Sequence, residues 1–181
     1  MIKIVGGKYR SRNIETPPES ITLPTKNRVR EALASALTND IPGAKVLDLF
    51  AGSGALSFEA LSRGAESALL VDANQEAYRV IMKNAASLKE RGAEIWNLDY
   101  LAALQKAKGR QFSLVFLDPP YALKEAYQKA VSYMLDNHML SKGCAIVLEY
   151  EGDIPFDGSP FDEVRHYTYG KSKVSIYRGI L

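Results

Sequence analysis

The sequence predicts an α/β fold: a seven-stranded, mostly parallel sheet with one antiparallel strand, helices on both faces, and a small N-terminal extension. Three observations lead to this prediction. Short apolar runs alternate with amphipathic segments from about residue 45 to residue 150. Two further strand-like runs then follow each other without an intervening helix, which introduces an antiparallel strand. Residues 1–40 do not join the alternation.

The strands are expected from apolar runs typical of strands buried on both sides, and the helices from apolar residues at helical spacing. Right-handed crossovers between parallel strands leave few possible topologies. The expected strands are 45–49, 67–72, 94–99, 112–118, 144–150, 162–170 and 173–179, the last two joined by a tight turn at Gly170-Lys171-Ser172. The expected helices are 55–64, 74–90, 100–107 and 123–138.

The first 40 residues are expected to form a small extension (1–40) ahead of the main domain (41–181). It should contain a hairpin around Gly6-Gly7 and a helix near 26–37 that Thr25 caps. Residues 1–30 carry seven basic and two acidic side chains, a net charge of +5, whereas the whole chain carries only +2. A basic surface neutralises phosphates, so this end indicates a nucleic-acid partner. A solvated charged terminus explains the charge equally well.

The composition argues against several classes of protein. One cysteine, Cys144, forbids an intramolecular disulfide, and the histidines His138 and His166 are far apart, so no metal site is expected. No apolar run approaches the ~18 residues of a membrane-spanning helix. The N-terminus lacks the apolar region of a signal peptide. We therefore expect a monomeric, cytoplasmic protein without a metal.

Ligands of such sheets bind beyond the carboxyl ends of the strands, so the residues there are the candidate site. The run 45–49 leads into Asp48-Leu-Phe-Ala-Gly-Ser-Gly, where Gly52 and Gly54 let the backbone approach a ligand. The third position of a dinucleotide-binding fingerprint is Ser57 rather than glycine. The loop alone therefore fits a ligand site and a plain strand-to-helix turn equally well.

Acidic residues also end the next two strands. Asp72 is placed to accept hydrogen bonds from a ribose, and Asp99 from an adenine amino group in the same cleft. For each acid taken alone, a helix N-cap or a solvated loop residue is the alternative. The recurrence of acids at three strand ends favours one shared cleft.

The stretch Asp118-Pro119-Pro120-Tyr121 ends a fourth apolar strand. The prolines fix the backbone and remove two donors, so a carboxylate and main-chain carbonyls are held rigidly beside an aromatic ring. This arrangement suits a planar exocyclic amine, which donates two hydrogen bonds while Tyr121 stacks on the attached base. A proline-rich turn that merely ends a strand is the alternative.

Three separated motifs resemble one known family. VLDLFAGSGALSFEA and FLDPPY are similar to the class I S-adenosylmethionine-dependent methyltransferases, whose fold is Rossmann-like, and to their amino-methylating members with an (Asp/Asn)-Pro-Pro-(Tyr/Phe) signature. GGKYRSR and LPTKNRVREAL narrow the resemblance to the bacterial RsmD family. That family methylates the N2 amine of a guanine, the guanine-966 type of position, in 16S rRNA.

The resemblance implies a role for each matching position. S-adenosylmethionine would be the cofactor, S-adenosylhomocysteine the product, and 16S rRNA or the small ribosomal subunit the partner. Asp118 and the Pro119 carbonyl would hold the guanine amine, with Pro120 stiffening the turn and Tyr121 stacking. The cofactor would contact Asp48, Phe50, Ala51, Gly52, Gly54, Asp72, Ala73, Asp99 and Tyr100, and the RNA Arg10, Arg12, Thr25, Arg28 and Glu31.

Other functions remain open at this point. A DNA or other RNA amino-methyltransferase, acting on adenine N6 or cytosine N4, shares the signature but usually carries a larger recognition region. A non-catalytic RNA-binding assembly protein would not need an intact Asp118-Pro-Pro-Tyr121, and Ser57 disfavours a dinucleotide oxidoreductase. Methylation of a pyrimidine carbon needs a cysteine nucleophile, and Cys144 lies inside an apolar run.

Overall fold

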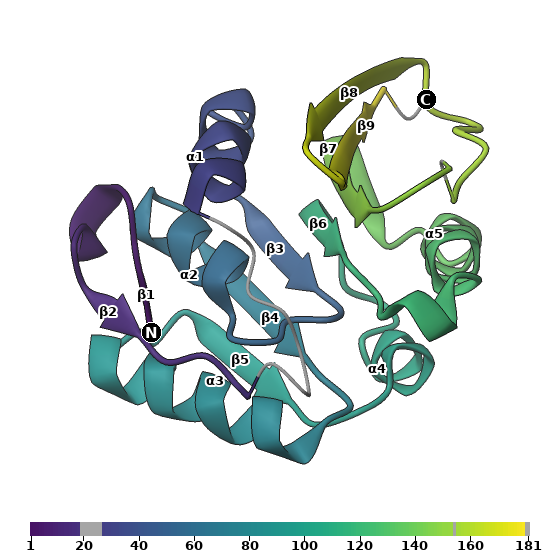
Figure 1. The fold of residues 1–181 in the computed structure, drawn as a ribbon. Coiled ribbons are helices and arrows are strands. Elements are labelled where there is room, and N and C mark those ends of the chain that lie inside the picture. The colour runs from purple at the N-terminus through teal and green to yellow at the C-terminus, as the bar shows by residue number, and fades with distance from the viewer. Residues whose placement is uncertain (19–26, 154, 180–181) are drawn as a thin grey trace.

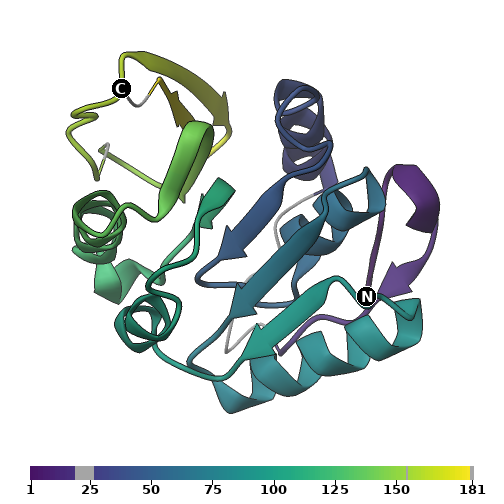
Figure 2. The ribbon, with the colours of Figure 1, turned by 180° about the vertical axis from the view of Figure 1, so that it is seen from behind.

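A computed structural model of the 181-residue chain describes residues 1–18, 27–153 and 155–179. The helices are α1 (Asn27–Ala36), α2 (Ala55–Ser62), α3 (Gln75–Leu88), α4 (Tyr100–Lys106) and α5 (Ala126–Asp136). The strands are β1 (Ile2–Lys3), β2 (Asn13–Ile14), β3 (Lys45–Asp48), β4 (Ser67–Val71), β5 (Ala93–Trp96), β6 (Phe112–Leu117), β7 (Leu140–Tyr150), β8 (Glu163–Tyr169) and β9 (Ser172–Arg178). Figure 1 and Figure 2 show this arrangement from opposite sides.

The main sheet has the strand order β5-β4-β3-β6-β7-β9-β8. Neighbouring strands from β5 to β7 pair in parallel, whereas β9 pairs antiparallel with both β7 and β8. The predicted seven-stranded sheet with a single antiparallel strand is therefore confirmed. From β3 the chain adds β4 and β5 on one side, and it then returns to place β6 and the later strands on the other side of β3. The carboxyl ends of β3 and β6 therefore flank the switch point where ligands of such sheets bind.

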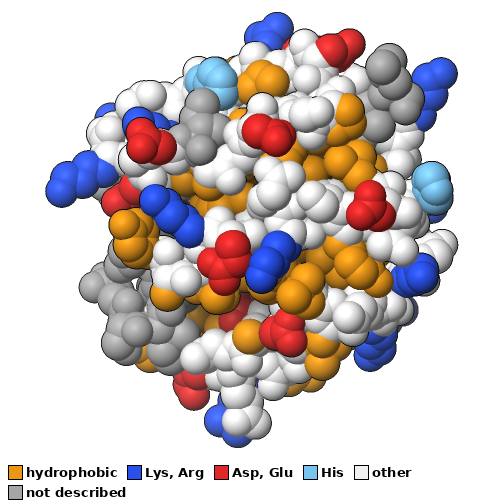
Figure 3. Space-filling view, turned by 90° about the vertical axis from the view of Figure 1, so that its right-hand side faces the viewer, with side chains coloured by type: hydrophobic (Ala, Val, Ile, Leu, Met, Phe, Trp, Pro, Cys, Tyr) orange, Lys and Arg blue, Asp and Glu red, His pale blue; other side chains and the backbone are white. Residues whose placement is uncertain are grey.

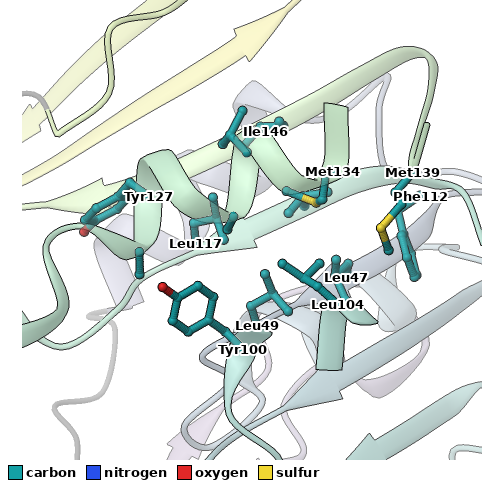
Figure 4. Close-up of a cluster of buried hydrophobic side chains, with 14 of the residues drawn as sticks. Leu47, Leu49, Tyr100, Leu104, Phe112, Leu117, Tyr127, Met134, Met139 and Ile146 are labelled. Carbon is teal, nitrogen blue, oxygen red and sulfur yellow. The ribbon is translucent and has the colours of Figure 1, made fainter. Parts of the chain in front are cut away.

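Both faces of the sheet are covered, as the apolar runs of the strands predict. Successive residues alternate between two buried clusters: Leu47, Val115 and Ile146 belong to one, and Val46, Leu114 and Val147 to the other. The first cluster continues into α4 and α5, and Figure 4 shows part of it. The second continues into α1, α2, α3 and the N-terminal hairpin.

Most element boundaries differ from the sequence prediction by one to four residues, and three of these differences have a clear structural cause. β7 starts at Leu140 rather than 144, because Phe112 pairs with Leu140 before an irregularity in the ladder. α5 starts at Ala126 rather than 123, because a 3₁₀ turn (Tyr121–Leu123) precedes it. The β8–β9 turn contains only two residues, since Tyr169 already pairs with Ser172. The predicted cap Thr25 lies outside the described residues.

The N-terminal extension forms the predicted hairpin, with a 3₁₀ turn (Gly7–Tyr9) between β1 and β2, and it is tied to α2. The buried carboxylate of Glu59 accepts hydrogen bonds from the N–H groups of Val5 and Gly6, at 2.9 and 3.0 Å. Arg63 Nε donates to it at 3.0 Å, and Arg30 Nη1 lies 3.5 Å away. Arg30 is only 1% exposed and also donates to the Lys3 carbonyl at 2.8 Å. One charge of the basic terminus therefore lies inside the protein rather than on its surface.

Candidate active site

The sheet register brings several carboxylates to one edge and one face. Asp48 lies level with Phe116 of β6, so Asp118 follows two residues further along the same face. Leu117 pairs with Leu148, which places Glu149 of β7 beside Asp118. Asp72 follows the end of β4 on the other side of β3. The carboxyl ends of four neighbouring strands therefore contribute acids to one edge of the sheet, as the sequence predicts for three of them.

Asp48 is a buried acid with one short hydrogen bond. The residue is only 4% exposed, and Ser57 Oγ donates a hydrogen bond to its Oδ2 at 2.7 Å. The pKa of Asp48 is raised to about 7, chiefly by burial and also by the charges of Asp72 and Glu149, against the lowering effect of hydrogen bonds from Ser57 and the Phe50 N–H. Ser57, which breaks the dinucleotide fingerprint, is therefore the hydrogen-bond partner of this acid.

The loop between β3 and α2 is held to the end of β4. Ala51 N donates to the Val71 carbonyl at 2.9 Å, and Gly52 N donates to Asp72 Oδ2 at 2.9 Å. Gly54 has φ +82°, and a Cβ there would lie 2.6 Å from the Phe58 ring, so only glycine fits. Burial raises the pKa of Asp72, while the N–H groups of Asn74 and Gly52 lower it.

The residues after β5 have structural partners of their own. Asp99 caps α4: its Oδ1 accepts from Leu101 N and Ala102 N at 2.8 and 3.2 Å, which is the alternative that the sequence leaves open. Tyr100 is buried in the apolar cluster under α5 (Figure 4), with its ring 5.4 Å from that of Phe50. Its burial, followed by the charges of Glu125 and Asp99, raises the pKa of Tyr100.

Asn97 is a residue that sequence reasoning missed in this region. Its Nδ2 donates to the carbonyls of Asp72 and Ala73, at 2.9 and 3.2 Å. These two bonds tie the end of β4 to the segment after β5. A polar amide directly after an apolar strand is the signal that could have drawn attention to it.

The Asp118-Pro119-Pro120-Tyr121 stretch leaves β6 as a rigid turn. The Pro120 carbonyl accepts from Leu123 N at 2.8 Å, which closes the 3₁₀ turn that Tyr121 begins. The Tyr121 residue is 81% exposed, with Lys124 Nζ 5.4 Å from the centre of its ring. A large aromatic side chain held so far into solvent is available to stack on a planar partner.

Asp118 is an exposed residue, yet many protein atoms lie around its carboxyl group. This desolvation raises the pKa of Asp118 well above its usual value, and the charges of Glu149 and Asp48 and a hydrogen bond with Glu149 raise it further. The upward direction follows from the neighbouring carboxylates whatever the exposure. Sequence reasoning missed Glu149, although CAIVLEY is also a strand that ends near an acid.

Comparisons with known proteins agree with the geometry. The family model described as "Conserved hypothetical protein 95" matches residues 2–178. "Ribosomal RNA small subunit methyltransferase D" of Escherichia coli K12 is 37% identical over 83% of this chain and 75% of its own length. The chain belongs to the RsmD family. YlbH of Bacillus subtilis is a further relative, 33% identical over 98% of each chain.

Solved structures of similar proteins show the same fold. The Escherichia coli protein yhhF superposes with a TM-score of 0.87 at 32% identity, over 98% of this chain and 97% of that one. An RNA methyltransferase from Salinibacter ruber in complex with S-adenosyl-L-homocysteine is 18% identical, with a TM-score of 0.66 over 86% of this chain and 93% of that one. The Rossmann-like methyltransferase fold is thus confirmed for this RsmD family member.

The predicted RNA-binding residues of the RsmD chain fall into two groups. Arg28, at the start of α1, lies 5.9 Å from the ring of Tyr169, near the carboxyl edge of the sheet, and Glu31 is exposed on the same helix. Arg10 and Arg12 are exposed on the hairpin. Arg12 Nη2 donates to the carbonyl of Ser87 at 2.9 Å, near the end of α3 and therefore toward the opposite edge. The structure does not bring Arg10 and Arg12 next to Asp118.

Charge is spread over other parts of the RsmD chain. On the face toward α5 and the C-terminal strands, acidic and basic side chains are interspersed with apolar ones (Figure 3). Within residues 1–18, 27–153 and 155–179, no group of three or more His, Cys, Asp or Glu side chains is arranged to hold a metal ion. No helix among the described residues is long and apolar enough to cross a membrane.

Proposed function

We propose that this RsmD family member transfers a methyl group from S-adenosylmethionine to the exocyclic N2 amine of a guanine in 16S rRNA. The observation that carries the proposal is the end of β6, where Asp118 lies among the acids of the neighbouring strand ends and shortly before the exposed ring of Tyr121. The family membership and the rRNA methyltransferase name of the Escherichia coli relative support it.

The residues at the ends of β3 and β4 fit the cofactor. The loop from Phe50 to Gly54 has two glycines with positive φ and places backbone close to Asp72. Asp48 and Asp72 are carboxyl groups whose ionised forms a nearby sulfonium or ammonium group would favour, and Asp72 is placed for ribose hydroxyls. When bound, S-adenosylmethionine supplies a methyl carbon that forms a bond to the amine nitrogen as its bond to sulfur breaks.

The protein's own residues prepare the amine for this transfer. Asp118 and the Pro119 carbonyl accept the two N2 hydrogens, which turns the nitrogen lone pair out of conjugation and toward the methyl group. Tyr121 stacks on the base and fixes its plane. Such orientation supplies roughly 7–11 kcal/mol of barrier lowering in favourable cases. The methylated nitrogen carries one proton too many, and Asp118, whose raised pKa makes it a competent proton acceptor, takes it and passes it to water.

The rRNA would approach the carboxyl edge of the sheet, where Arg28 and Tyr121 lie. Arg10 and Arg12 would contact phosphates of an RNA that also extends along the hairpin. The target nucleotide must leave its stack to reach Asp118 and Tyr121, as for other enzymes that act on a base. We propose that the chain acts as a monomer.

The test measures methyl transfer from labelled S-adenosylmethionine to protein-free 16S rRNA, to small ribosomal subunits that lack the modification, and to double-stranded DNA. The product is digested and the methylated nucleoside identified. We expect N2-methylguanosine from at least one ribosomal substrate. N6-methyladenine or N4-methylcytosine would replace the proposal by the alternative amino-methyltransferase, and no transfer to any substrate would contradict catalysis altogether.

A further inference from the structure

Asp118 lies beside a second acid, Glu149, on the neighbouring strand β7. Continuing the register from Leu117 and Leu148 places Glu149 beside Asp118, close enough for its charge to raise the pKa of Asp118. The backbone of Glu149 is held on both sides. Its carbonyl accepts from Tyr127 Oη of α5 at 2.5 Å, and the residue pairs with Val174 of β9.

Two adjacent carboxyl oxygens form a pattern of acceptors, and only some bases match it. Guanine presents N1–H directly beside its N2 amine, so its Watson–Crick edge offers two neighbouring donors. Adenine N1 and cytosine N3, which lie beside the exocyclic amines of those bases, are acceptors. A carboxylate next to the amine-binding acid therefore attracts guanine and repels the other two bases.

We propose that Glu149 selects guanine by accepting the N1–H of the target base while Asp118 holds the N2 amine. The inference rests on the proposed function, because it assigns the second acceptor of the same site. Two neighbouring carboxyl groups disfavour each other's negative charge, and the two donors of guanine relieve this repulsion.

Asp48 does not fit this role, although its charge also reaches Asp118. It lies two residues deeper than Asp118, level with Phe116, and its Oδ2 accepts the hydroxyl of Ser57. It is also fully buried, whereas Glu149 is half-buried and therefore open to a ligand. Of the two acids near Asp118, Glu149 is the one that a base can contact.

The test uses the ribosomal substrate that supports methylation, prepared with one of three bases at the target position. Guanine is the reference. 2-Aminopurine keeps the N2 amine but has an acceptor at N1. 6-Thioguanine keeps both N1–H and the amine and changes only the 6-substituent, so it controls for the loss of the oxygen in 2-aminopurine. The wild-type protein is compared with Glu149→Gln, whose amide can either accept or donate, and with Glu151→Gln as the matched control on the same strand end.

The wild-type protein should prefer guanine over 2-aminopurine by at least about 100-fold in kcat/KM, because a site built to accept a hydrogen bond rejects a base that cannot donate it. Glu149→Gln should reduce this preference to about 10-fold or less, mostly by gaining activity on 2-aminopurine. Glu151→Gln should keep the wild-type ratio, and 6-thioguanine should behave like guanine. Calorimetric titration with S-adenosylmethionine verifies that each variant is folded.

Equal rates on guanine and 2-aminopurine in the wild-type protein would overturn the inference without reference to any variant. An unchanged ratio in Glu149→Gln would overturn it as well. Both results leave the proposed function standing, because N2-methylguanosine is still formed. If the wild-type protein forms no N2-methylguanosine, the proposed function itself has failed.

Discussion

The protein places carboxylates in two contrasting surroundings. Glu59, in the middle of α2, is buried and accepts from two backbone N–H groups and from Arg63, with Arg30 also beside it. At the carboxyl edge of the sheet, Asp48, Asp72, Asp118 and Glu149 lie near one another, and each raises the pKa of at least one neighbour or has its own raised. Compensated charge indicates a structural role, and crowded like charge marks a site kept ready for a ligand.

The largest effect expected from this comparison is on stability. Glu59→Ala should lower the free energy of unfolding by about 3–5 kcal/mol, because it removes the carboxylate that faces the buried Arg30 and accepts from two backbone N–H groups. Urea denaturation measures the change. Glu66→Ala removes an exposed carboxylate 4.0 Å from Lys45 and should change stability by about 0.5 kcal/mol or less. Equal effects of the two substitutions would contradict the structural role of Glu59.

The acidic edge should instead make stability depend on pH. The folded protein holds the proton of Asp48 up to about pH 7, whereas the unfolded chain releases it near 3.8. The contribution of Asp48 is therefore fully present below pH 4 and is lost as the pH rises toward 7, by up to about 4 kcal/mol. We expect the stability of Asp48→Asn relative to wild type to increase over this range, as measured by urea unfolding at several pH values. A constant difference would mean that Asp48 titrates normally.

Asp118→Ala should separate activity from stability. Methyl transfer should fall at least about 100-fold, which corresponds to about 2.7 kcal/mol of transition-state stabilisation. The free energy of unfolding should stay the same or rise, because one of several crowded carboxylates is removed. Labelled methyl transfer, urea unfolding and calorimetric cofactor binding measure the three properties. Glu76→Ala, an exposed acid at the start of α3, is the control for activity. Full activity of Asp118→Ala would exclude it from the reaction.

Substitution of Arg28 should have the smallest effect of these changes. It tests which edge of the sheet makes the principal contact with RNA. Arg28→Gln should weaken RNA binding and reduce the slope of log affinity against log salt by about 0.9, the value for one lost phosphate contact. Arg10→Gln, toward the other edge of the sheet, should have a smaller effect on the slope. A larger effect for Arg10 would move the principal RNA contact from the carboxyl edge to the hairpin.

The sequence predicts most of the sheet because its strands carry two independent signals, apolar runs and turns between them. The acids at strand ends are predictable for the same reason, since parallel strands bring their carboxyl ends together. Glu149 escaped prediction because β7 continues through it to Tyr150. Glu59 and Arg30 escaped because each has an ordinary position in a helix. Their pairing depends on how α1 packs against α2, which short-range periodicity does not encode.

The tie between the hairpin and α2 has a mechanical consequence. α2 has eight residues and is therefore only about 12 Å long. One end follows the glycine loop through Gly54, and Glu59 in the middle of the helix accepts hydrogen bonds from the backbone N–H groups of Val5 and Gly6. The helix therefore connects the hairpin directly to the glycine loop. A chain shortened by its first residues would lose the hydrogen bonds that Glu59 accepts from Val5 and Gly6, and with them a direct contact to the helix that follows the glycine loop.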